Sequence, residues 1–333
     1  MPLTEPTIPL DQRATGGPAP LVSVIMPAWN AFPWIEEAVA SVLTQSFRDL
    51  ELIVVNDGST DGDYRQFERR DPRVRVIEGE RGGVSRARNL AMAAARGRYF
   101  AFIDADDVWV PGKLDAQVRF LEANPDIDVA YGEIARWACL PDGTYPPASS
   151  YFPSLPAVYE VDPARRGWGY TRILMGSPLG MITPVMRRSL YEKVGEFDVR
   201  LSRGEDYDFW LRCSREGRLQ RFRAVLALYR MRPTSAMHQM VKDNPLVQVL
   251  ESARERFGLA DPDGRAVTPA QFRRRLGRCH FDHGYNHFWS GDPGVAHRAF
   301  GRALLHRYRP ARSLVYWVLS GFKRLRHGGP HGG

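Results

Sequence analysis

The chain has 333 residues, 44% of them hydrophobic and 25% charged, a composition that allows a full buried core and excludes a disordered or fibrous protein. Its formal net charge is +8, yet residues 236–333 hold 16 Lys and Arg against 7 Asp and Glu, so the first 235 residues carry a net charge of −1. A basic surface over the whole chain is therefore not indicated, and because the C-terminal part contains no recognised nucleic-acid-binding module we expect no nucleic-acid partner.

The positions of the cysteines and histidines indicate the redox compartment of the protein and the kind of general base it can use. The cysteines Cys139, Cys213 and Cys279 are far apart and form no CxxC pair, which favours a reducing compartment. All eight histidines lie from His238 onward, so we expect any general base in the first 235 residues to be a carboxylate. No signal peptide is evident, and the apolar stretch 314–319 is too short to cross a bilayer. We therefore expect a cytoplasmic protein.

Residues 1–20 are rich in Pro and Gly and are expected to be a flexible tail. From residue 22 onward, short apolar runs alternate with segments of helical periodicity. We expect strands at 22–26, 51–55, 73–77 and 99–103. We expect one helix to begin at Pro33 and two further helices to cover 84–96 and 111–123. This alternation predicts an α/β domain with a mostly parallel sheet flanked by helices.

The rest of the chain is less regular at first and then helical. A strand is expected at 127–131, and the Pro- and Gly-rich region 140–180 is expected to be irregular and to face the substrate. Helices are expected at 184–193 and 205–217, and residues 236–333 are helical by pattern. We therefore divide the chain into a tail at 1–20, an α/β domain at 21–235 and a basic helical appendage at 236–333.

The stretch YFAFIDADDVW at 99–109 is the most informative segment, because a buried strand ends in three carboxylates. Asp104, Asp106 and Asp107 repel one another, so such a cluster needs a divalent cation or a cationic side chain nearby. For Asp107, a solvated turn or helix cap explains the sequence equally well. For Asp104 and Asp106 we favour a functional role, because ligands of open α/β sheets bind outside the carboxyl ends of strands.

The first two strands end in polar or aromatic residues as well. We assign Pro27, at the end of the first strand, to the nucleotide site. Trp29 follows and is either a stacking surface for a base or a half-buried core aromatic. The second is followed by Asp57, which either accepts an N–H of a base or bonds its own turn. Neither turn contains G-x-G-x-x-G, so a nicotinamide enzyme is disfavoured.

A glycine pair then leads into a helix that opens with two arginines. Gly82 and Gly83 permit a close backbone approach, and a helix start favours anions. Arg86 and Arg88 are two residues apart and cannot share a helix face, so we assign the nucleotide contact to Arg86. We interpret Arg88 as either a solvated surface charge or a packing partner.

Taken together, these segments resemble family 2 of the inverting glycosyltransferases, the bacterial surface-polysaccharide type with the GT-A fold. The resemblance covers about residues 22–235 and rests on SVIMPAWN, ELIVVNDGSTDG, GGVSRARN, YFAFIDADD and VGEFDVRLSRGEDYDFWLR. It implies that Trp29 and Asp57 hold the base, although Tyr is commoner at the first position. It further implies that Asp104 contacts the ribose and that Asp106 ligates Mg²⁺ or Mn²⁺ as part of a D-x-D motif.

The resemblance also assigns the segment at 204–208, which contains Glu205 and Asp206. It implies that Asp206 is the catalytic base and that Glu205 is part of the substrate site, whereas capping of a helix N-terminus also explains both acids. Where the family usually has Tyr-Arg-x-His, this chain has Tyr-Arg-Met-Arg, with Arg232 in the His position. With Arg232 in place of the histidine, the metal ion lacks one of its expected ligands. The guanidinium of Arg232 is suited to pair with a diphosphate instead.

These residues predict transfer of a sugar from a nucleotide-diphosphate donor to a hydroxyl of a glycan or lipid-linked acceptor. The alternatives are a nucleotidyltransferase on a related sheet and an inactive nucleotide- or glycan-binding protein. The sequence at 323–326, Lys-Arg-Leu-Arg, either rests on the inner face of an anionic membrane or is a solvated tail. His283 and His287, together with Cys279 and His280, are expected to form an ordinary helix face, with a zinc site as the alternative.

Overall fold

The computed structural model describes residues 18–152, 159–176, 179–232 and 240–327. The predicted tail therefore lies almost wholly outside the described residues. The chain divides into two compact units. Unit 1 comprises Met1–Gly169 and Leu179–Arg232, and unit 2 comprises Tyr170–Pro178 and Pro233–Gly333. The sequence did not predict that the short segment from Tyr170 belongs with the C-terminal helices.

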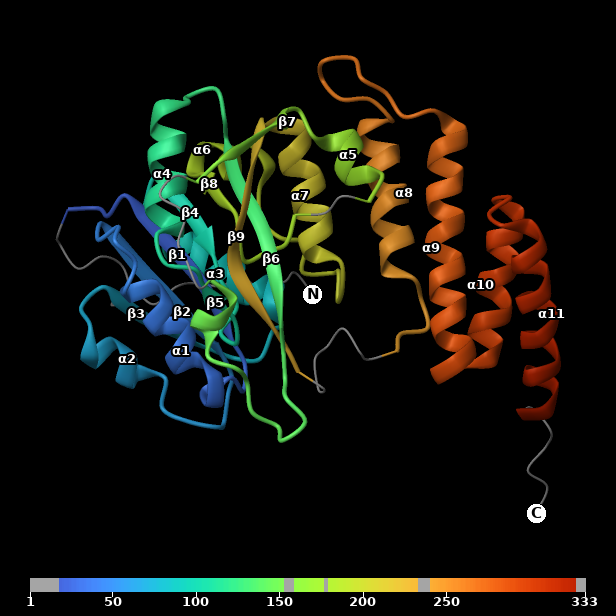
Figure 1. Ribbon diagram of the computed structural model, residues 1–333, viewed down its shortest axis with the longest axis horizontal. Coiled ribbons are helices and arrows are strands. Elements are labelled where there is room, and N and C mark those ends of the chain that lie inside the picture. Colours follow the sequence, from blue (N-terminus) through green and yellow to red (C-terminus); the bar gives the residue numbers. More distant parts are fainter. Residues whose placement is uncertain (1–17, 153–158, 177–178, 233–239, 328–333) are drawn as a thin grey trace, which may run out of the picture. The chain divides into compact units, whose positions relative to one another are not determined.

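Unit 1 is built on one sheet, which over the described residues has the strand order β3-β2-β1-β4-β8-β6-β9-β5, with β7 paired to β9 (Figure 1). The strands are β1 Val22–Ala28, β2 Leu50–Asp57, β3 Val74–Gly79, β4 Tyr99–Phe102, β5 Val108–Trp109, β6 Val129–Ala138, β7 Val161–Gly167, β8 Val185–Arg187 and β9 Leu219–Met231. Strand β1 runs parallel to β2 and β4, and β2 runs parallel to β3. Strand β8 is antiparallel to β4 and β6 and so joins the two halves of the sheet.

The helices of unit 1 pack on this sheet. They are α1 Phe32–Leu43, α2 Arg65–Arg70, α3 Val84–Ala94, α4 Lys113–Ala123, α6 Arg188–Val194 and α7 Glu205–Glu216, with a 3-10 turn at Ala148–Tyr151. The predicted apolar stripe of α1 is buried at Ile35, Ala38, Val39 and Val42. The fold class predicted from the alternation of strands and helices is therefore confirmed.

Two of the predicted segments were wrong in part. The helix expected at 184–193 begins as strand β8 and becomes helical only from Arg188, because Val185 and Met186 pair between β4 and β6. The irregular region 140–180 contains strand β7, whose pairing with β9 is long-range, and helix α5, which is only five residues long, so neither leaves a clear period in the sequence. Strand β5 is only two residues long and carried no recognisable signal.

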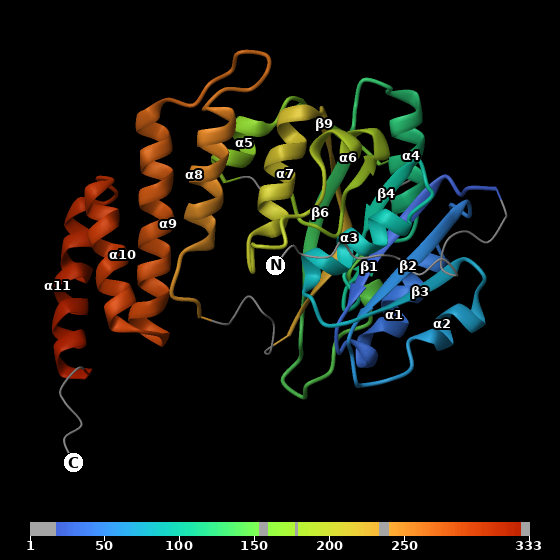
Figure 2. The same cartoon turned by 180° about the vertical axis from the view of Figure 1, so that it is seen from behind.

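Unit 2 is helical, as predicted. Its helices over the described residues are α5 Tyr170–Leu174, α8 Pro245–Phe257, α9 Pro269–Ser290, α10 Pro293–Leu305 and α11 Pro310–His327. The last four begin with Pro, whose fixed φ and missing N–H suit a first helical position. Helices α9, α10 and α11 lie side by side in both views (Figures 1 and 2) around a cluster that includes Phe281 and Phe300. No helix of the described residues is both long and apolar enough to cross a bilayer.

One buried charge in unit 1 stands outside any ion pair. Lys113, at the start of α4, is fully buried, and its Nζ has no hydrogen-bond partner among the described residues. The amine lies 4.0 Å from the centre of the Trp109 ring. Burial lowers the pKa of Lys113 well below its ordinary value. The folded state therefore bears the cost of desolvating this amine, with only an aromatic face to offset it.

We expect Lys113→Met to raise the free energy of unfolding by about 1 kcal/mol or more, because an apolar chain of similar length replaces the unpaired amine. The unfolded state binds the proton that the folded state releases, so wild-type stability rises with pH toward about 10.4 and the advantage of the variant shrinks over that range. Urea unfolding at several pH values measures both effects. Lys193→Met, at an exposed position of α6, is the control. A loss of stability in Lys113→Met would contradict the prediction.

Candidate active site

The polar residues predicted from the strand ends gather at one edge of the sheet. Asp57 is the last residue of β2, and Asp104 follows β4 by two positions. Strand β1 lies between these two strands and pairs with both, and Trp29 comes directly after it. Because parallel strands end at the same edge, the three residues lie at the carboxyl ends of neighbouring strands, where α/β sheets bind ligands.

A buried arginine holds the acidic residues of this edge together. Arg88, on α3, is only 3% exposed. Its Nη2 lies 2.9 Å from Asp104 Oδ1, and its Nη1 lies 3.2 Å from Glu205 Oε1 at the start of α7. The charges of Asp104, Glu205 and Asp206 all raise the pKa of the guanidinium. Arg88, left open in the sequence as a solvated or packed side chain, is therefore packed and paired with two carboxylates.

The two acids at the start of α7 keep raised pKa values despite this cation. Burial raises the pKa of Asp206, Arg88 opposes the rise, and Asp104 adds to it. Burial also raises the pKa of Glu205, again against Arg88. Asp206 Oδ1 accepts a hydrogen bond of 2.7 Å from the N–H of Tyr207. Asp206 is thus a partly buried carboxylate of increased basicity, which suits a general base.

The predicted metal ligand has a cationic side chain as its partner. Asp106 Oδ2 lies 2.7 Å from Nη2 of Arg232, which follows strand β9. Burial raises the pKa of Asp106, and Arg232 opposes that rise. No group of three or more His, Cys, Asp or Glu side chains suited to a metal ion is found among the described residues. The residues around Asp106 therefore fit a guanidinium partner rather than a resident divalent ion.

The neighbouring Asp107 has a structural role. It is fully buried, and its Oδ1 accepts a hydrogen bond of 2.8 Å from the backbone N–H of Arg230 on β9. The Arg230 side chain in turn donates from Nε to the carbonyl oxygen of Asp106 over 2.8 Å. Burial, with Asp106 and Asp104 adding to it, raises the pKa of Asp107 well above its ordinary value. These bonds fix the loop after β4 to the end of β9.

The residues predicted to hold a base lie at the ends of β1 and β2. Trp29 is 46% exposed, so it is not a core aromatic, and the guanidinium of Arg81 lies 3.7 Å from the centre of its ring. Asp57 does not bond its own turn. Its two carboxylate oxygens accept hydrogen bonds of 2.7 and 2.9 Å from the N–H groups of Gly82 and Gly83. Asp57 therefore shapes the glycine loop, and each oxygen keeps a lone pair for a ligand.

The other two predicted nucleotide-binding residues, Pro27 and Arg86, differ in their exposure to solvent. Pro27 is buried within β1, in register with Val55 of β2. Arg86 is exposed in the first turn of α3 and lies over Gly82, where an added Cβ would come 2.3 Å from Arg86 Cδ. The nucleotide contacts assigned to Pro27 and Arg86 stay predictions.

Sequence reasoning assigned no site role to Arg88, Arg81 or Trp34. For Arg88 a signal existed: it lies on the same face of α3 as the buried Ser85 and Met92, and a charge on a buried face needs a partner. Arg81 and Trp34 carried no comparable signal. Both reach the site through contacts between segments far apart in the chain, with Trp29 and Arg232 respectively.

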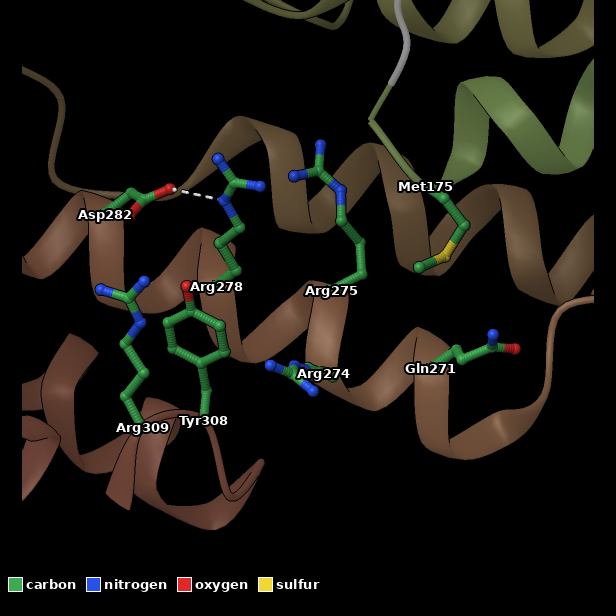
Figure 3. Close-up of a pocket in the computed structure, with 8 residues that line it drawn as sticks. All are labelled: Met175, Gln271, Arg274, Arg275, Arg278, Asp282, Tyr308 and Arg309. Carbon is green, nitrogen blue, oxygen red and sulfur yellow. Dashed lines mark ion pairs between the residues drawn. The ribbon is translucent and has the colours of Figure 1, made fainter. Parts of the chain in front are cut away.

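Unit 2 contains a separate, basic pocket of about 550 Å³. Figure 3 shows that most of its side chains come from α9, with Tyr308 and Arg309 just before α11 and Met175 just after α5. It is lined by Met175, Gln271, Arg274, Arg275, Arg278, Asp282, Tyr308 and Arg309. Only Asp282 offsets the four arginines, through an ion pair of 3.5 Å with Arg278. The excess of guanidinium groups favours an anionic ligand.

The histidines of α9 are occupied by structural contacts. His287 Nε2 lies 2.8 Å from the carbonyl oxygen of Val241, and its Nδ1 accepts a hydrogen bond of 3.1 Å from the N–H of Asp292. His283 Nε2 lies 3.3 Å from the carbonyl oxygen of Lys242. The two histidines therefore lie on one face of α9 and hold the backbone at Val241 and Lys242 against that helix.

The sheet order and the helices that flank the sheet are those of the GT-A fold. Residues 23–160 match the model of Glycosyl transferase family 2. The chain belongs to this family, whose enzymes invert the anomeric configuration.

Curated relatives and solved structures agree with this assignment. The chain is 47% identical over 106 residues to TuaG of Bacillus subtilis, a putative teichuronic acid biosynthesis glycosyltransferase; the match spans 31% of this chain and 42% of TuaG. It is 28% identical to the Escherichia coli glucosyltransferase WfgD, over 67% of this chain and 82% of WfgD. The chain thus spans less than half the length of TuaG.

Two solved structures share the fold over both units. Residues 1–349 of Staphylococcus aureus TarS, in complex with UDP-GlcNAc, align with a TM-score of 0.62 at 20% identity over 93% of each chain. The mannosyltransferase PcManGT of Pyrobaculum calidifontis, in complex with GDP-Man and Mn²⁺, aligns with a TM-score of 0.55 at 21% identity, over 93% of this chain and 88% of PcManGT. At these identities the likeness shows the fold.

We expect Arg88→Ala to lower the free energy of unfolding by about 1–3 kcal/mol, because it leaves the partly buried carboxylates of Asp104 and Glu205 without their cation. Arg86→Ala, an exposed change two residues away on the same helix, is the matched control and is expected to stay within about 0.5 kcal/mol of the wild type. Urea denaturation followed by circular dichroism measures both. Equal effects of the two substitutions would show that Arg88 is not the organising cation.

Proposed function

We propose that the chain transfers a sugar from a nucleoside-diphosphate donor to a hydroxyl group of a glycan or lipid-linked acceptor, with inversion at the anomeric carbon. The observation that carries the proposal is the convergence of Asp104, Glu205 and Asp206 around Arg88 at the carboxyl edge of the sheet. Membership of Glycosyl transferase family 2 supports the same reaction.

The donor is proposed to lie across the ends of β1, β2 and β4. Trp29 offers an exposed ring on which a base can stack, beside Arg81, and Asp57 has acceptor capacity left for an N–H of the base. Asp104, paired with Arg88 through Oδ1, is placed to accept hydrogen bonds from the ribose hydroxyls. UDP-GlcNAc in TarS and GDP-Man in PcManGT support a nucleotide-sugar donor without fixing its base or sugar.

Asp206 is proposed to act as the general base. Its carboxylate takes the proton of the acceptor hydroxyl while the hydroxyl oxygen attacks the anomeric carbon. The bond from that carbon to the diphosphate oxygen breaks on the opposite face, so the configuration inverts. Burial keeps the pKa of Asp206 raised, which brings its basicity closer to that needed near neutral pH.

Mg²⁺ or Mn²⁺ at Asp106 is implied by the family resemblance, and PcManGT was solved with Mn²⁺. In this chain, however, the Asp106 carboxylate is already paired with Arg232. The negative charge that develops on the leaving diphosphate is proposed to be met by the arginines of this edge.

The acceptor is proposed to be anionic or lipid-linked and to belong to cell-surface polysaccharide biosynthesis. WfgD, by its name, acts on a diphosphoundecaprenol-linked sugar, and TuaG is named for teichuronic acid biosynthesis. The arginine-lined pocket of unit 2 is itself suited to bind phosphate or carboxylate groups.

Helix α11 supports the predicted contact with the inner face of the membrane. Its buried face is polar at Ser313 and Ser320, which are 0% exposed. Its outer face instead exposes a stripe of large apolar side chains, all between 41% and 75% exposed: Leu314, Val315, Val318, Leu319, Phe322 and Leu325. The helix has no acidic residue and ends in Lys323, Arg324 and Arg326. An exposed apolar stripe with basic flanks is typical of helices that lie on anionic lipid surfaces.

We expect Asp206→Asn to lower the transfer or donor-hydrolysis rate by about 10²–10⁴-fold while nucleotide binding is kept, because only the base is lost. Donors found by a thermal-shift screen of UDP, dTDP, GDP and their sugars supply the assay. Asp198→Asn, which changes a carboxylate paired with Arg200 outside the site, is the control.

The same assay tests the pH dependence. The base works only when ionised, and its pKa is raised, so kcat/KM is expected to fall with decreasing pH already above the ordinary Asp value of about 3.9.

A variant Asp206→Asn that keeps more than about a tenth of wild-type turnover would exclude Asp206 as the base.

We expect the protein to bind vesicles that contain phosphatidylglycerol more strongly than vesicles of phosphatidylcholine alone, with added salt weakening the binding. Replacing Val318 and Phe322 together by Glu should abolish the binding, because charges then interrupt the apolar stripe. Val199→Glu, at a residue 61% exposed in unit 1, is the matched control. Co-sedimentation with vesicles measures all three proteins. Undiminished binding of the double variant would exclude α11 as the contact.

A further inference from the structure

Arg232 occupies the position beside Asp106 at which a divalent ion is expected. Its Nη2 lies 2.7 Å from Asp106 Oδ2, and the two side chains are 25% and 17% exposed. The guanidinium also lies 4.5 Å from the centre of the Trp34 ring on α1. It is therefore held on two sides, by a carboxylate and by an aromatic face, rather than extended into solvent.

The backbone that carries Arg232 is fixed to the same acidic loop. Two residues earlier, Arg230 donates its backbone N–H to Asp107 and its Nε to the carbonyl oxygen of Asp106, both over 2.8 Å. The Arg230 guanidinium further lies 3.9 Å from the centre of the Trp137 ring. Because these bonds anchor the end of β9 to the Asp-Ala-Asp-Asp loop, the contact between Arg232 and Asp106 is part of the local structure.

Arg232 keeps hydrogen-bonding capacity for a ligand. A guanidinium has five N–H donors, and the Nε of Arg232 is buried without a hydrogen-bond partner among the described residues. Oxygen atoms of a diphosphate are suited to accept from such a group. A divalent ion at Asp106 would instead have to displace the guanidinium and would meet a positive charge where the family motif supplies a histidine.

We propose that Arg232 supplies, at Asp106, the positive charge that a divalent ion supplies in metal-dependent relatives, so that this chain binds the diphosphate of its donor without a metal. Arg232 is then a substrate-binding residue paired with Asp106, and Trp34 positions it. The proposal rests on the proposed function for the existence of a nucleoside-diphosphate site and differs from it in the identity of the cation.

The test compares the wild type with Arg232→His and Arg232→Ala. Calorimetry with UDP and GDP, in EDTA and in Mn²⁺, measures nucleotide affinity, and electron paramagnetic resonance measures bound Mn²⁺ directly. For the wild type we expect affinities in EDTA and Mn²⁺ that agree within about threefold, and no stoichiometric Mn²⁺. Arg232→His is expected to bind Mn²⁺ at least about tenfold more tightly than the wild type.

The remaining variants separate charge from metal binding. Arg232→Ala is expected to lose nucleotide affinity in EDTA and to regain part of it with Mn²⁺, because Asp106 is then free. Arg136→His, an exposed change on the adjacent strand β6, should change neither measurement. Two results would overturn the role proposed for Arg232 but not the proposed function. They are loss of wild-type nucleotide binding in EDTA and a stoichiometric Mn²⁺ signal that Asp106→Asn removes. A chain that binds no nucleoside diphosphate under any condition would overturn the proposed function as well.

Discussion

The buried guanidinium of Arg88 is the constraint on which the site depends. A guanidinium does not lose its proton on burial, so Arg88, which is 3% exposed, stays charged and is stabilised on α3 by Asp104 and Glu205. This one cation brings the end of β4 and the start of α7, about a hundred residues apart in the chain, to the same place. The result is an acidic edge that is already organised for a donor.

Arginines pair with the carboxylates at both ends of the Asp-Ala-Asp segment of this edge. Arg88 pairs with Asp104, and Arg232 pairs with Asp106. The two arginines have different consequences. Arg88 is buried and holds the carboxylates in place, whereas Arg232 is partly exposed and has an unpaired Nε donor among the described residues. The same sequence segment thus combines a structural ion pair with one that is suited to meet the phosphates of a ligand.

Much of the fold could be predicted from the sequence, because the strands β1, β2, β3 and β4 are short apolar runs separated by amphipathic helices. The acidic residues were found because they follow those strands directly. The arginines were harder, since their partners are distant in sequence. Arg88 looked like one of two exposed charges in a helix start, and the pairing of Arg232 with Asp106 depends on how β9 ends beside the loop after β4. Strand β7 was missed for the same reason, because its pairing with β9 is long-range, whereas helix α5, with five residues, is too short to show a helical period.

A crystal structure of the protein with a bound nucleoside diphosphate is the most direct test of whether this edge is the donor site. The base should lie against Trp29, the ribose near Asp104, and the diphosphate within hydrogen-bonding distance of Arg232, with Arg88 still joining Asp104 to Glu205. Binding of the nucleotide elsewhere, for example among the arginines of α9 in unit 2, would contradict it.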